Sequence, residues 1–542
     1  MENFVNHALI KENTIESRQY QEDIVSSVLE KGNSLVVAPT ALGKTILAVV
    51  IGVKRIEKFP ESKILILAPT RPLALQHQKS FFRFTKVKEE EICCITGTIK
   101  PKERQKMFEN SKIICSTPQC IANDVKKGLI SLENVSLCVF DEAHRAIGNY
   151  SYVFVSKNYS ETAKNPLVVA LTASPGWEKE KIQKIADNLF IKNIEVRTHK
   201  DEDVREYVKE INVEYVPVDL PKEFNEIILL FKQYLAEKAA ELHRMGVSHT
   251  DNLNFFSRKN LLVLQKKVSR NLAIRGRRQP SLFAAASKIA AMMNVMHSLI
   301  LIETQGIDSL NKYFFRLEQK ILNKEATKAV KGLMNDDRIK KAVQLTEKLK
   351  REGIEHPKIQ KLKDILEDYL ANNPNSRVLV FNHYRDSITN VYLHLKDSKI
   401  IKAREFVGQA DKGTVKGMTQ NEQSETILKF RQGEYNVLLA TSVAEEGLDI
   451  PSCDLVILFE PVPSEIRTIQ RRGRTGRLDE GKVIILMAKG TRDEAYYWIA
   501  HHKEKKMHKI LSGMQKDAAF DEESEIKPKA AKDKQTKLFE FK

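Results

Sequence analysis

The stretch SLVVAPTALGKT, residues 34–45, decides the fold class of this chain. Its first part is a run of small and branched apolar residues that predicts a buried β-strand. Its second part is a loop that ends in Gly43, Lys44 and Thr45, where a helical pattern begins. A loop in this position directs backbone N–H groups and a helix N-terminus at phosphate. The stretch therefore predicts an α/β domain that binds a nucleotide.

Similar apolar runs elsewhere predict two α/β domains. Strands are expected at residues 34–38, 63–68, 112–115, 137–140 and 167–171, and again at 377–381, 435–440, 454–458 and 482–486. Strands that are apolar throughout and alternate with helical patterns are typical of parallel sheets covered on both faces.

The 542-residue length also requires several domains, since single cores stop growing at roughly 250–300 residues. Between the two α/β segments the chain has few prolines and repeats apolar residues every three to four positions, which predicts helices. Near its end the chain becomes polar and charged, which predicts disorder. We therefore expect an α/β domain at 1–205, an all-helical insertion at 206–345, a second α/β domain at 346–510 and a disordered tail at 511–542.

The net charge is +17, from 88 basic and 71 acidic residues. This excess favours an anionic polymer as partner, although a lysine-rich solvated surface explains it equally well. The six cysteines form no C-x-x-C pair and have no histidine at metal-ligand spacing. This pattern predicts buried free thiols in a reducing compartment.

No targeting or membrane segment is expected. Residues 1–11 lack a long apolar core after a basic stretch, so they do not resemble a signal peptide. No uninterrupted run of about 20 apolar residues occurs, which predicts no membrane span. We expect an intracellular protein, cytoplasmic or nucleoid-associated, that is not secreted.

Two carboxylates join the phosphate loop as candidate catalytic groups. Asp141 and Glu142 follow an apolar strand, and parallel sheets place ligand chemistry at the carboxyl ends of their strands. We expect Lys44 to contact the β- and γ-phosphates of ATP, and Thr45 and Asp141 to hold Mg²⁺. Glu142 is expected to orient and deprotonate the attacking water.

An arginine cluster lies more than 400 residues downstream, in the run QRRGRTGR at 470–477. Four arginines separated by small residues cannot form a core. Arginine offers a fixed fork of donors to phosphate oxygens and stays charged near neutral pH. A second basic turn, at Arg275, Arg277 and Arg278, favours phosphate contact over an ordinary helix-bundle surface.

These signatures resemble those of the superfamily-two helicases and translocases, which have two RecA-like motor domains. The resemblance extends through further runs: RQYQ at 18–21, APTRPL at 68–73, TG at 96–97, TPQ at 117–119, LTAS at 171–174, ATS at 440–442 and EGLDIP at 446–451.

The resemblance implies roles for individual residues. Gln21 would read adenine, and Ala41, Gly43, Gly447 and Asp449 would line the nucleotide site. Arginine fingers at Arg474 and Arg477, with Gln470, would contact the γ-phosphate from the second domain; Arg471 and Arg472 could face DNA or support the site. Contacts to the nucleic-acid strand would come from Arg71, Thr96, Gly97, Thr117 and Thr441.

Finer runs resemble the archaeal Hef and eukaryotic FANCM branch: FVGQ at 406–409, GMTQ at 417–420, EPVPSEIR at 460–467 and ILMAKGTRDE at 485–494. The helical insertion between the motor domains fits the same branch. This resemblance covers about residues 10–510 and implies ATP-driven remodelling of forked or branched DNA, such as stalled replication forks and junctions.

The chain departs from this branch in two places. Ala41 stands where relatives often have glycine, which matters only if that position needs a positive φ. Full-length Hef-type proteins also carry a nuclease with a Glu-Arg-Lys signature, and no such triplet occurs here. We therefore expect no DNA cleavage by this chain, and a separate nuclease as a possible partner.

The last eight residues, QTKLFEFK at 535–542, resemble the peptide that docks on sliding clamps. One helical turn would bring Leu538 and Phe541 together as an apolar plug, with Gln535 beside them. Lys542 replaces the second aromatic residue of the usual peptide. A sliding clamp is thus a predicted partner.

Two alternative functions stay open. Duplex-RNA-activated ATPases and RNA helicases share this motor and its helical insertion. A non-enzymatic scaffold on the clamp is the second alternative, and the presence of Lys44, Glu142, Arg474 and Arg477 argues against it.

Overall fold

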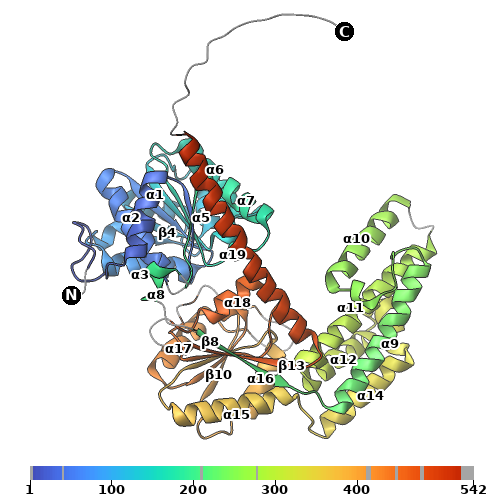
Figure 1. The fold of residues 1–542 in the computed structure, drawn as a ribbon. Helices are drawn as coiled ribbons and strands as arrows, with labels where there is room; N and C mark the ends of the chain where they lie inside the picture. The colour runs from blue at the N-terminus through green and yellow to red at the C-terminus, as the bar shows by residue number, and fades with distance from the viewer. Residues whose placement is uncertain are drawn as a thin grey trace, which may run out of the picture. The chain divides into compact units, whose positions relative to one another are not determined.

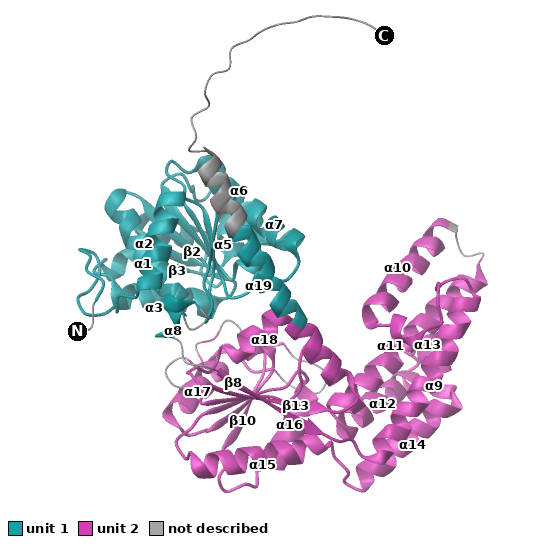
Figure 2. Cartoon of the chain, viewed as in Figure 1, with its two compact units in different colours: residues 1–208, 502–542 teal, residues 209–501 magenta. Residues whose placement is uncertain are grey.

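The computed structural model describes residues 4–39, 42–199, 201–207, 211–275, 279–410, 417–445, 448, 450–476 and 481–525. Side chains are described as far as residue 515, that of residue 275 excepted. The chain divides into two compact units, residues 1–208 with 502–542, and residues 209–501 (Figure 2).

The first unit is built on a seven-stranded parallel sheet in the order β3-β4-β2-β5-β6-β1-β7 (Figure 1). Its strands are β1 Ser34–Val37, β2 Lys63–Leu67, β3 Ile92–Ile95, β4 Ile113–Ser116, β5 Val135–Asp141, β6 Val168–Thr172 and β7 Asn193–Val196. Every residue of β1, β4 and β6 is buried, as expected for strands covered on both faces.

Two layers of helices cover this sheet. Helices α1 (Gln19–Lys31), α2 (Lys44–Lys58) and α3 (Arg71–Phe84) pack side by side in one layer, and α5 (Pro118–Lys126), α6 (Ser151–Thr162) and α7 (Lys179–Asn188) in the other. The short elements of this unit are α4 Pro101–Asn110, α8 Glu202–Arg205, η2 Glu89–Glu91 and η3 Ala143–Arg145. The expected parallel α/β architecture is confirmed.

The second unit contains a six-stranded parallel sheet in the order β10-β11-β9-β12-β13-β8. Its strands are β8 Ile211–Val218, β9 Val378–Phe381, β10 Ala403–Phe406, β11 Val437–Ala440, β12 Leu455–Leu458 and β13 Gly481–Ala488, and its helices are α15 Pro357–Asn372, α16 Arg385–Leu395, α17 Gln420–Gln432, α18 Glu465–Arg472 and the short η6 Ser442–Ala444. This second parallel sheet also confirms the expected fold class.

One strand of this sheet comes from an unexpected part of the chain. Residues 206–345 were expected to be helical throughout, yet β8 lies in this range and pairs along its whole length with β13. Its residues alternate in exposure, because β8 is the outermost strand of the sheet. The chain therefore contributes one strand to the second sheet before the helices begin.

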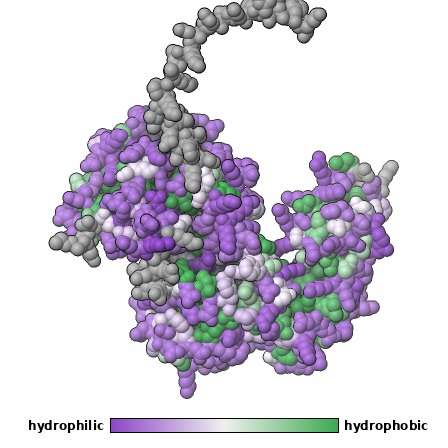
Figure 3. Space-filling model, in the orientation of Figure 1, coloured by the Kyte–Doolittle hydropathy of each residue, from purple (hydrophilic) through white to green (hydrophobic). Residues whose placement is uncertain are grey.

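A helical bundle follows β8. It comprises α9 Lys222–Arg244, η4 Leu253–Phe255, α10 Arg258–Arg275, α11 Pro280–Thr304, α12 Ile307–Leu322, α13 Lys328–Asn335 and α14 Asp337–Arg351. These helices share one apolar core of their own. On the visible face, hydrophobic residues gather over this part of the molecule (Figure 3). The bundle confirms the expected helical insertion between the two sheets in the sequence.

Helix α11 is long and apolar enough to cross a membrane, by length and composition alone. Half of its most apolar part is buried inside the structure, where α11 packs against α9, α10 and α12. This burial identifies α11 as the central helix of the bundle core.

The last described helix, α19 (Arg492–Glu525), begins in the second unit, and its residues from 502 onward belong to the first (Figure 2). Within the first unit, Lys503 and Lys506 lie over the Trp177 ring. All six cysteines are free and buried, as expected. The helix runs past residue 510, where the expected disordered tail begins.

Candidate nucleotide and nucleic-acid sites

The candidate phosphate and carboxylate residues of the first unit follow β1 and lie at the end of β5, the two strands on either side of β6. The phosphate loop follows β1, the segment around Ser174 follows β6, and Glu142 follows β5 directly. Because the strands are parallel, these three segments leave the sheet at the same carboxyl edge, where α/β proteins bind ligands.

The phosphate loop is shaped by a glycine. Gly43 has a φ of +65° and precedes the first turn of α2. A Cβ at this position would lie 2.9 Å from Nε2 of Gln21, so both conformation and space favour glycine here. Lys44 donates hydrogen bonds from Nζ to the carbonyls of Ala38 and Pro39, at 2.9 and 3.2 Å. The lysine ammonium thus lies over the loop that the sequence assigns to phosphate.

Helix α1 is fixed to this loop. The buried Gln21 side chain donates from Nε2 to the carbonyl of Leu42 at 3.3 Å, and the Tyr20 hydroxyl donates to the same carbonyl at 3.2 Å. The residue expected to read adenine is therefore held against the phosphate loop. Thr45 lies in the first turn of α2 and is half-buried, within the same short segment.

Asp141 is held as a carboxylate at the end of β5. Its Oδ2 lies 2.9 Å from Nε2 of His77, and its Oδ1 accepts the backbone N–H of Glu142 at 2.9 Å. Burial alone would raise the pKa of Asp141, but the His77 hydrogen bond and charge, and the positive charge of Lys44, outweigh it and lower that pKa. An ionised carboxylate facing Lys44 fits the expected magnesium ligand.

Glu142 occupies a strained backbone position. It has a φ of +51°, which is uncommon for a residue with a side chain and costs about 1–3 kcal/mol. His144 Nδ1 lies 3.2 Å from Oε2 of Glu142 and 3.3 Å from Oγ1 of Thr172. Thr172 in turn accepts the backbone N–H of Ser174. These contacts connect the candidate catalytic carboxylate to the segment after β6.

Magnesium is implied by the fold family, and the residues present fit it. Among the residues that the structure describes, no group of three or more His, Cys, Asp or Glu side chains could hold a metal ion alone. Mg²⁺ is usually held by one or two carboxylates together with substrate phosphates and water. Asp141 and the Thr45 hydroxyl supply that smaller set of protein oxygens.

The candidate nucleic-acid contacts of the first unit lie on the other half of the same edge. Thr96 follows β3, Thr117 follows β4, and Arg71 comes shortly after β2. These three strands are neighbours in the order β3-β4-β2, next to β5. Arg71 and Gly97 are exposed, Thr117 is half-buried, and Thr96 is buried with its hydroxyl 3.0 Å from that of Thr98. One edge of the sheet thus brings both groups of candidate residues together.

In the second unit, Glu445 joins three arginines. Its carboxylate accepts hydrogen bonds from Arg467 at 2.8 and 2.9 Å and from Nε of Arg471 at 2.8 Å. Its backbone carbonyl accepts from Nη2 of Arg474, whose Nη1 donates to the carbonyl of Leu448 at 3.2 Å. Arg474 and Gln470 are buried, with 8% and 4% exposed.

Arg471 is fully buried, so the expectation that these arginines cannot be part of a core is wrong for this residue. Its charge is compensated by Glu445, and it also donates to the carbonyl of Glu460 at 3.4 Å. It lies over the ring of Phe381, which forms a cation–π contact. These contacts favour the second alternative stated for Arg471, support of the site. Thr441, the candidate phosphate contact after β11, is buried, and its backbone N–H donates to the carbonyl of Phe406 at 3.1 Å.

Several expected site residues fall outside the part of the chain that the structure describes. The side chain of Arg275 is among them, and so are the following residues: Ala41, Arg277, Arg278, Gly447, Asp449, Arg477, Gln535, Leu538 and Phe541. Their roles stay predictions.

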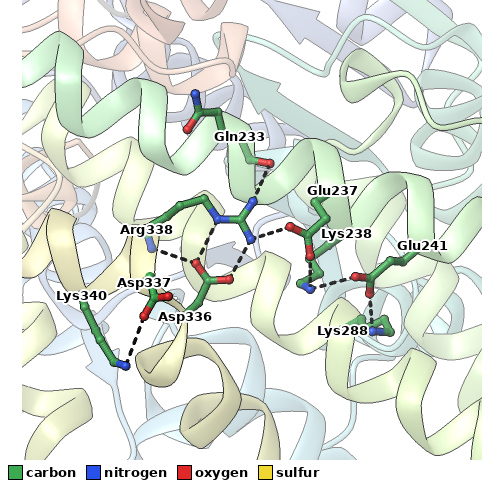
Figure 4. A network of polar contacts seen from close by, with 9 residues as sticks. All are labelled: Gln233, Glu237, Lys238, Glu241, Lys288, Asp336, Asp337, Arg338 and Lys340. Atoms are coloured by element: carbon green, nitrogen blue, oxygen red, sulfur yellow. Dashed lines mark hydrogen bonds and ion pairs between the residues drawn. The ribbon is translucent and has the colours of Figure 1, made fainter.

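Charges in the helical bundle are arranged in two ways. On α9, α11 and α14, basic side chains pair with carboxylates, as for Lys238 with Glu237 and Glu241 at 2.6 and 2.9 Å, and Arg338 with Asp336 at 2.7 Å (Figure 4). Burial alone would raise the pKa of Glu241, but hydrogen bonds from Lys288 and Lys238 lower it to about 2. This network neutralises its own charges.

Helix α10 differs, because it contains no acidic residue. Four of its basic side chains are exposed and make no ion pair with any residue that the structure describes: Lys259, Lys266, Lys267 and Arg270. Unpaired cations in a row favour contact with a polyanion. In the sequence, these cations are followed by the predicted basic turn with Arg275, Arg277 and Arg278.

Two residues at these sites carry little sequence signal. His77 is a histidine on the buried side of α3, a position that more often belongs to a core. Glu445 precedes the run EGLDIP and is one of two adjacent glutamates, which are common on solvated surfaces. Only the fold brings His77 to Asp141, and Glu445 to three arginines.

Three protein-family models match the chain. A DEAD/DEAH box helicase model covers residues 18–182, and a helicase conserved C-terminal domain covers 357–479. A model described as a putative ATP-dependent RNA helicase, helical bundle, covers 223–353. The crystal structure of the Pyrococcus furiosus Hef helicase domain matches with a TM-score of 0.69 and 44% identity, over 90% of this chain and 99% of that one. The chain belongs to the Hef/FANCM branch of the superfamily-two helicases.

The relatives in this family include proteins named as DNA helicases and proteins named as RNA helicases. A putative ATP-dependent RNA helicase of Methanocaldococcus jannaschii is 38% identical over 94% of this chain. The ATP-dependent DNA helicase mph1 of Neurospora crassa is 33% identical over 88%, and the Fanconi anemia group M protein homolog of Mus musculus is 32% identical over 92%. The chain spans 63%, 41% and 26% of the lengths of these three relatives.

Proposed function

We propose that this chain is an ATP-dependent helicase and translocase that remodels forked or branched DNA during replication-fork repair and recombination. The observation that carries the proposal is the carboxyl edge of the first sheet. There the candidate ATP residues follow β1 and lie at the end of β5, and the candidate strand contacts follow β3, β4 and β2. A rigid sheet can thus link a change at the nucleotide to a change at the strand.

In this proposal, ATP binds to Lys44 and Thr45 of the first motor domain, with Mg²⁺ neutralising phosphate charge. Asp141 supplies a ligand for the metal, and Glu142 accepts the proton of the attacking water. Arg474, with Arg477, stabilises the charge that develops on the γ-phosphate. Because the site needs residues of both motor domains, hydrolysis and product release would change how the domains engage the strand.

Coupling inside the first motor domain is proposed to run through His144. It contacts both Glu142 and Thr172, and Ser174 is connected to Thr172. The Ser174 hydroxyl also lies 3.0 Å from Sδ of Met507 on α19. A change at Glu142 on hydrolysis can therefore be transmitted to the segment after β6.

Branched DNA is proposed as the substrate because the relatives named as DNA helicases match over most of this chain. The basic face of α10 and the +17 net charge support an anionic polymer. Phosphate contacts of this kind would position the protein without reading sequence.

The test is ATP hydrolysis measured with forked DNA, a four-way junction, plain duplex DNA and duplex RNA, each at the same phosphate concentration. We expect the largest stimulation with the forked or four-way DNA. Stronger stimulation by duplex RNA would overturn the choice of DNA. No stimulation by any of the four would overturn the motor function.

An RNA substrate is the second candidate. It is favoured because the Methanocaldococcus relative and the family model of the helical bundle are both described as RNA helicases. The duplex-RNA arm of the same measurement decides between the two substrates.

We further propose that the run 535–542 docks on a sliding clamp and that a separate nuclease acts on the remodelled DNA. The sequence pattern of Gln535, Leu538 and Phe541 supports the first part. A synthetic peptide of this run should bind the clamp of the same organism, and Leu538→Ala with Phe541→Ala should abolish binding. Equal binding of both peptides would refute the docking role.

A further inference from the structure

The second unit contains a cavity that the proposed ATP and strand contacts leave unused. It has a volume of about 920 Å³ and lies between the helical bundle and the carboxyl edge of the second sheet. One wall comes from α9, α10 and α11, and the other from the residues after β9 and β12 and from the start of α19. The run EPVPSEIR, which distinguishes the Hef-like branch, contributes residues 460–463 and Arg467 to this wall.

Two tyrosines form an aromatic part of the wall. Tyr384 follows β9 and Tyr496 lies on α19, and both are half-buried. Burial raises the pKa of Tyr384 to about 12 and also raises that of Tyr496, so both phenols are neutral. The Tyr384 ring is itself supported edge-on by His383, with ring centroids 4.8 Å apart. Supported neutral rings offer faces on which a flat apolar group can stack.

Four cationic side chains line the same cavity, and two of them are unpaired within the described part of the chain. Lys232 on α9 and Arg258 at the start of α10 are exposed, and neither makes a hydrogen bond or ion pair with a residue that the structure describes. The other two cations of the wall are already engaged, since Arg467 donates to Glu445 and Arg492 donates to the carbonyl of Met296. Lys232 and Arg258 are therefore available to an anionic ligand.

A buried acceptor lies at the inner wall. Glu303 on α11 is only 4% exposed, and its Oε2 accepts no hydrogen bond. This oxygen lies 3.8 Å from Nε of Arg492, a distance that makes an ion pair without a hydrogen bond. A buried oxygen without a donor indicates that a ligand could supply an N–H group.

Flat stacking surfaces, free cations and a buried acceptor together match the parts of a nucleotide. We propose that this cavity receives one unpaired nucleotide, with its base on Tyr384 and Tyr496, its phosphates at Lys232 and Arg258, and an exocyclic amino group donating to Glu303. Single-strand binding sites commonly combine aromatic stacking with a cationic track.

A protein segment fits less well. The cations are unpaired at the rim, and α10 continues from Arg258 with no acidic residue, so the surroundings favour a polyanion. The inference rests on the proposed function and adds to it a site that holds an unpaired strand at the branch. Single-stranded DNA and RNA share this chemistry, so both are included in the test.

The test is photo-crosslinking of the unaltered protein to forks with 5-iodouracil at successive positions of one unpaired arm, built in DNA or in RNA, followed by mass spectrometry. We expect crosslinks to peptides that contain Tyr384 or Tyr496 from one or two adjacent positions. The nucleic acid, DNA or RNA, that gives the higher yield of these crosslinks is identified as the natural strand. Crosslinks confined to other peptides would overturn the proposal.

Affinity measurements provide a second readout. Tyr384→Leu with Tyr496→Leu should weaken single-strand binding about tenfold, the scale of losing one stacked base. Lys232→Ala with Arg258→Ala should lower the slope of log K against log salt by about 1.4, since each single-strand phosphate contact contributes about 0.7. Lys340→Ala, which removes an exposed lysine paired with Asp337, is the matched control and should change neither. Unchanged affinity and slope in both double variants would also overturn the proposal.

The base preference tests Glu303. Oligo-dC should bind more tightly than oligo-dT, because thymine has no exocyclic amino group, and Glu303→Gln should reduce this difference. Equal binding of dC and dT would refute the role of Glu303. If ATP hydrolysis responds to forks but the cavity fails these tests, the inference fails and the proposed function stands; if no nucleic acid stimulates hydrolysis, the proposed function fails whatever the crosslinks show.

Discussion

The two parallel sheets hold their candidate catalytic charges differently. At the edge of the first sheet, Lys44, Asp141 and Glu142 are half-buried, and Glu142 has a strained backbone. In the segments that follow β11 and β12 of the second sheet, Arg471 and Arg474 are buried and hydrogen-bonded to Glu445. The first sheet therefore presents groups to a ligand, whereas the second holds its cations in a fixed position.

This difference has a physical reason. Groups that bind ATP and water must be reachable, so their orientation comes from neighbours such as His77 and His144 at their sides. A guanidinium that stabilises a transition state contributes most when it is already oriented, since no reorganisation is then needed during the reaction. Burial against Glu445 supplies that orientation. Changes at the first sheet should therefore affect chemistry directly, and changes at the second should affect both chemistry and stability.

The largest effect is expected from Glu142→Gln. Loss of the general base should lower the rate of DNA-stimulated ATP hydrolysis about 10³-fold, while ATP still binds. Steady-state hydrolysis and binding of a fluorescent ATP analogue measure the two effects. Glu133→Gln, just before the other end of β5, is the matched control and should hydrolyse ATP normally. A variant with more than a tenth of the normal rate would show that Glu142 is not the base.

A smaller effect is expected from Arg474→Lys. Lysine keeps the charge but loses the planar fork, so hydrolysis should fall about 10²-fold with little change in ATP affinity. Arg404→Lys, an exposed arginine of β10, should have no effect. If Arg474→Lys changed only the affinity for ATP, its role would be ground-state binding and the comparison between the sheets would lose its basis.

Glu445→Gln tests the link between orientation and stability. Removal of one partner of a buried ion pair costs about 3–5 kcal/mol, so the midpoint of thermal unfolding should fall. Hydrolysis should fall about tenfold through misplacement of the arginines. Glu425→Gln, which breaks an exposed pair with Lys429, should leave the unfolding midpoint and the hydrolysis rate unchanged. Normal hydrolysis in a destabilised Glu445 variant would separate orientation from catalysis.

The basic face of α10 should influence binding more than chemistry. Lys266→Ala with Arg270→Ala should lower the slope of log K against log salt by about 1.8 on duplex arms, about 0.9 for each phosphate contact. The salt series is measured by fluorescence anisotropy on a fork. An unchanged slope would mean that the unpaired cations of α10 do not contact DNA.

The smallest effect concerns pH. Burial is the main cause that raises the pKa of Glu460 to about 7, against the opposing charges of Arg471 and Lys358. A carboxyl whose pKa is raised in the folded state stabilises the fold at low pH and loses that contribution as pH rises from about 4.5 to about 7. Glu460→Gln should thus unfold at a higher temperature than the unaltered protein by a margin that grows as pH rises from about 4.5 to about 7 and stays constant above pH 7. A difference in unfolding temperature between the variant and the unaltered protein that is the same at every pH would show that Glu460 does not ionise in this range.

Nine strands could be predicted from the sequence, and all nine are interior strands, with a neighbour on each side. The four that were not predicted, β3, β7, β8 and β10, are the outermost strands of the sheets. β7 and β10 carry polar residues such as Glu195 and Arg404, and β8 is largely exposed, so no continuous apolar run marks these three. β3 is the exception, because its residues ICCI are all apolar and buried and do carry a local signal. The places of these outermost strands depend on a partner strand that is distant in the sequence.

The same limit applies to the sites. Gly43, Lys44 and the Asp141–Glu142 pair could be found because loop and strand carry their own local signal. His77 and Glu445 could not, because their partners are 64 and 22–29 residues away along the chain. The cavity with Tyr384, Glu303 and Arg258 depends on three segments that only the fold brings together.

The most direct test of the central claim is strand displacement on a fluorescently labelled DNA fork, measured with ATP for the unaltered protein and for Lys44→Ala. The account predicts ATP-dependent displacement by the unaltered protein, faster than on a plain duplex, and none by Lys44→Ala. Displacement without ATP, or equal displacement by Lys44→Ala, would contradict it.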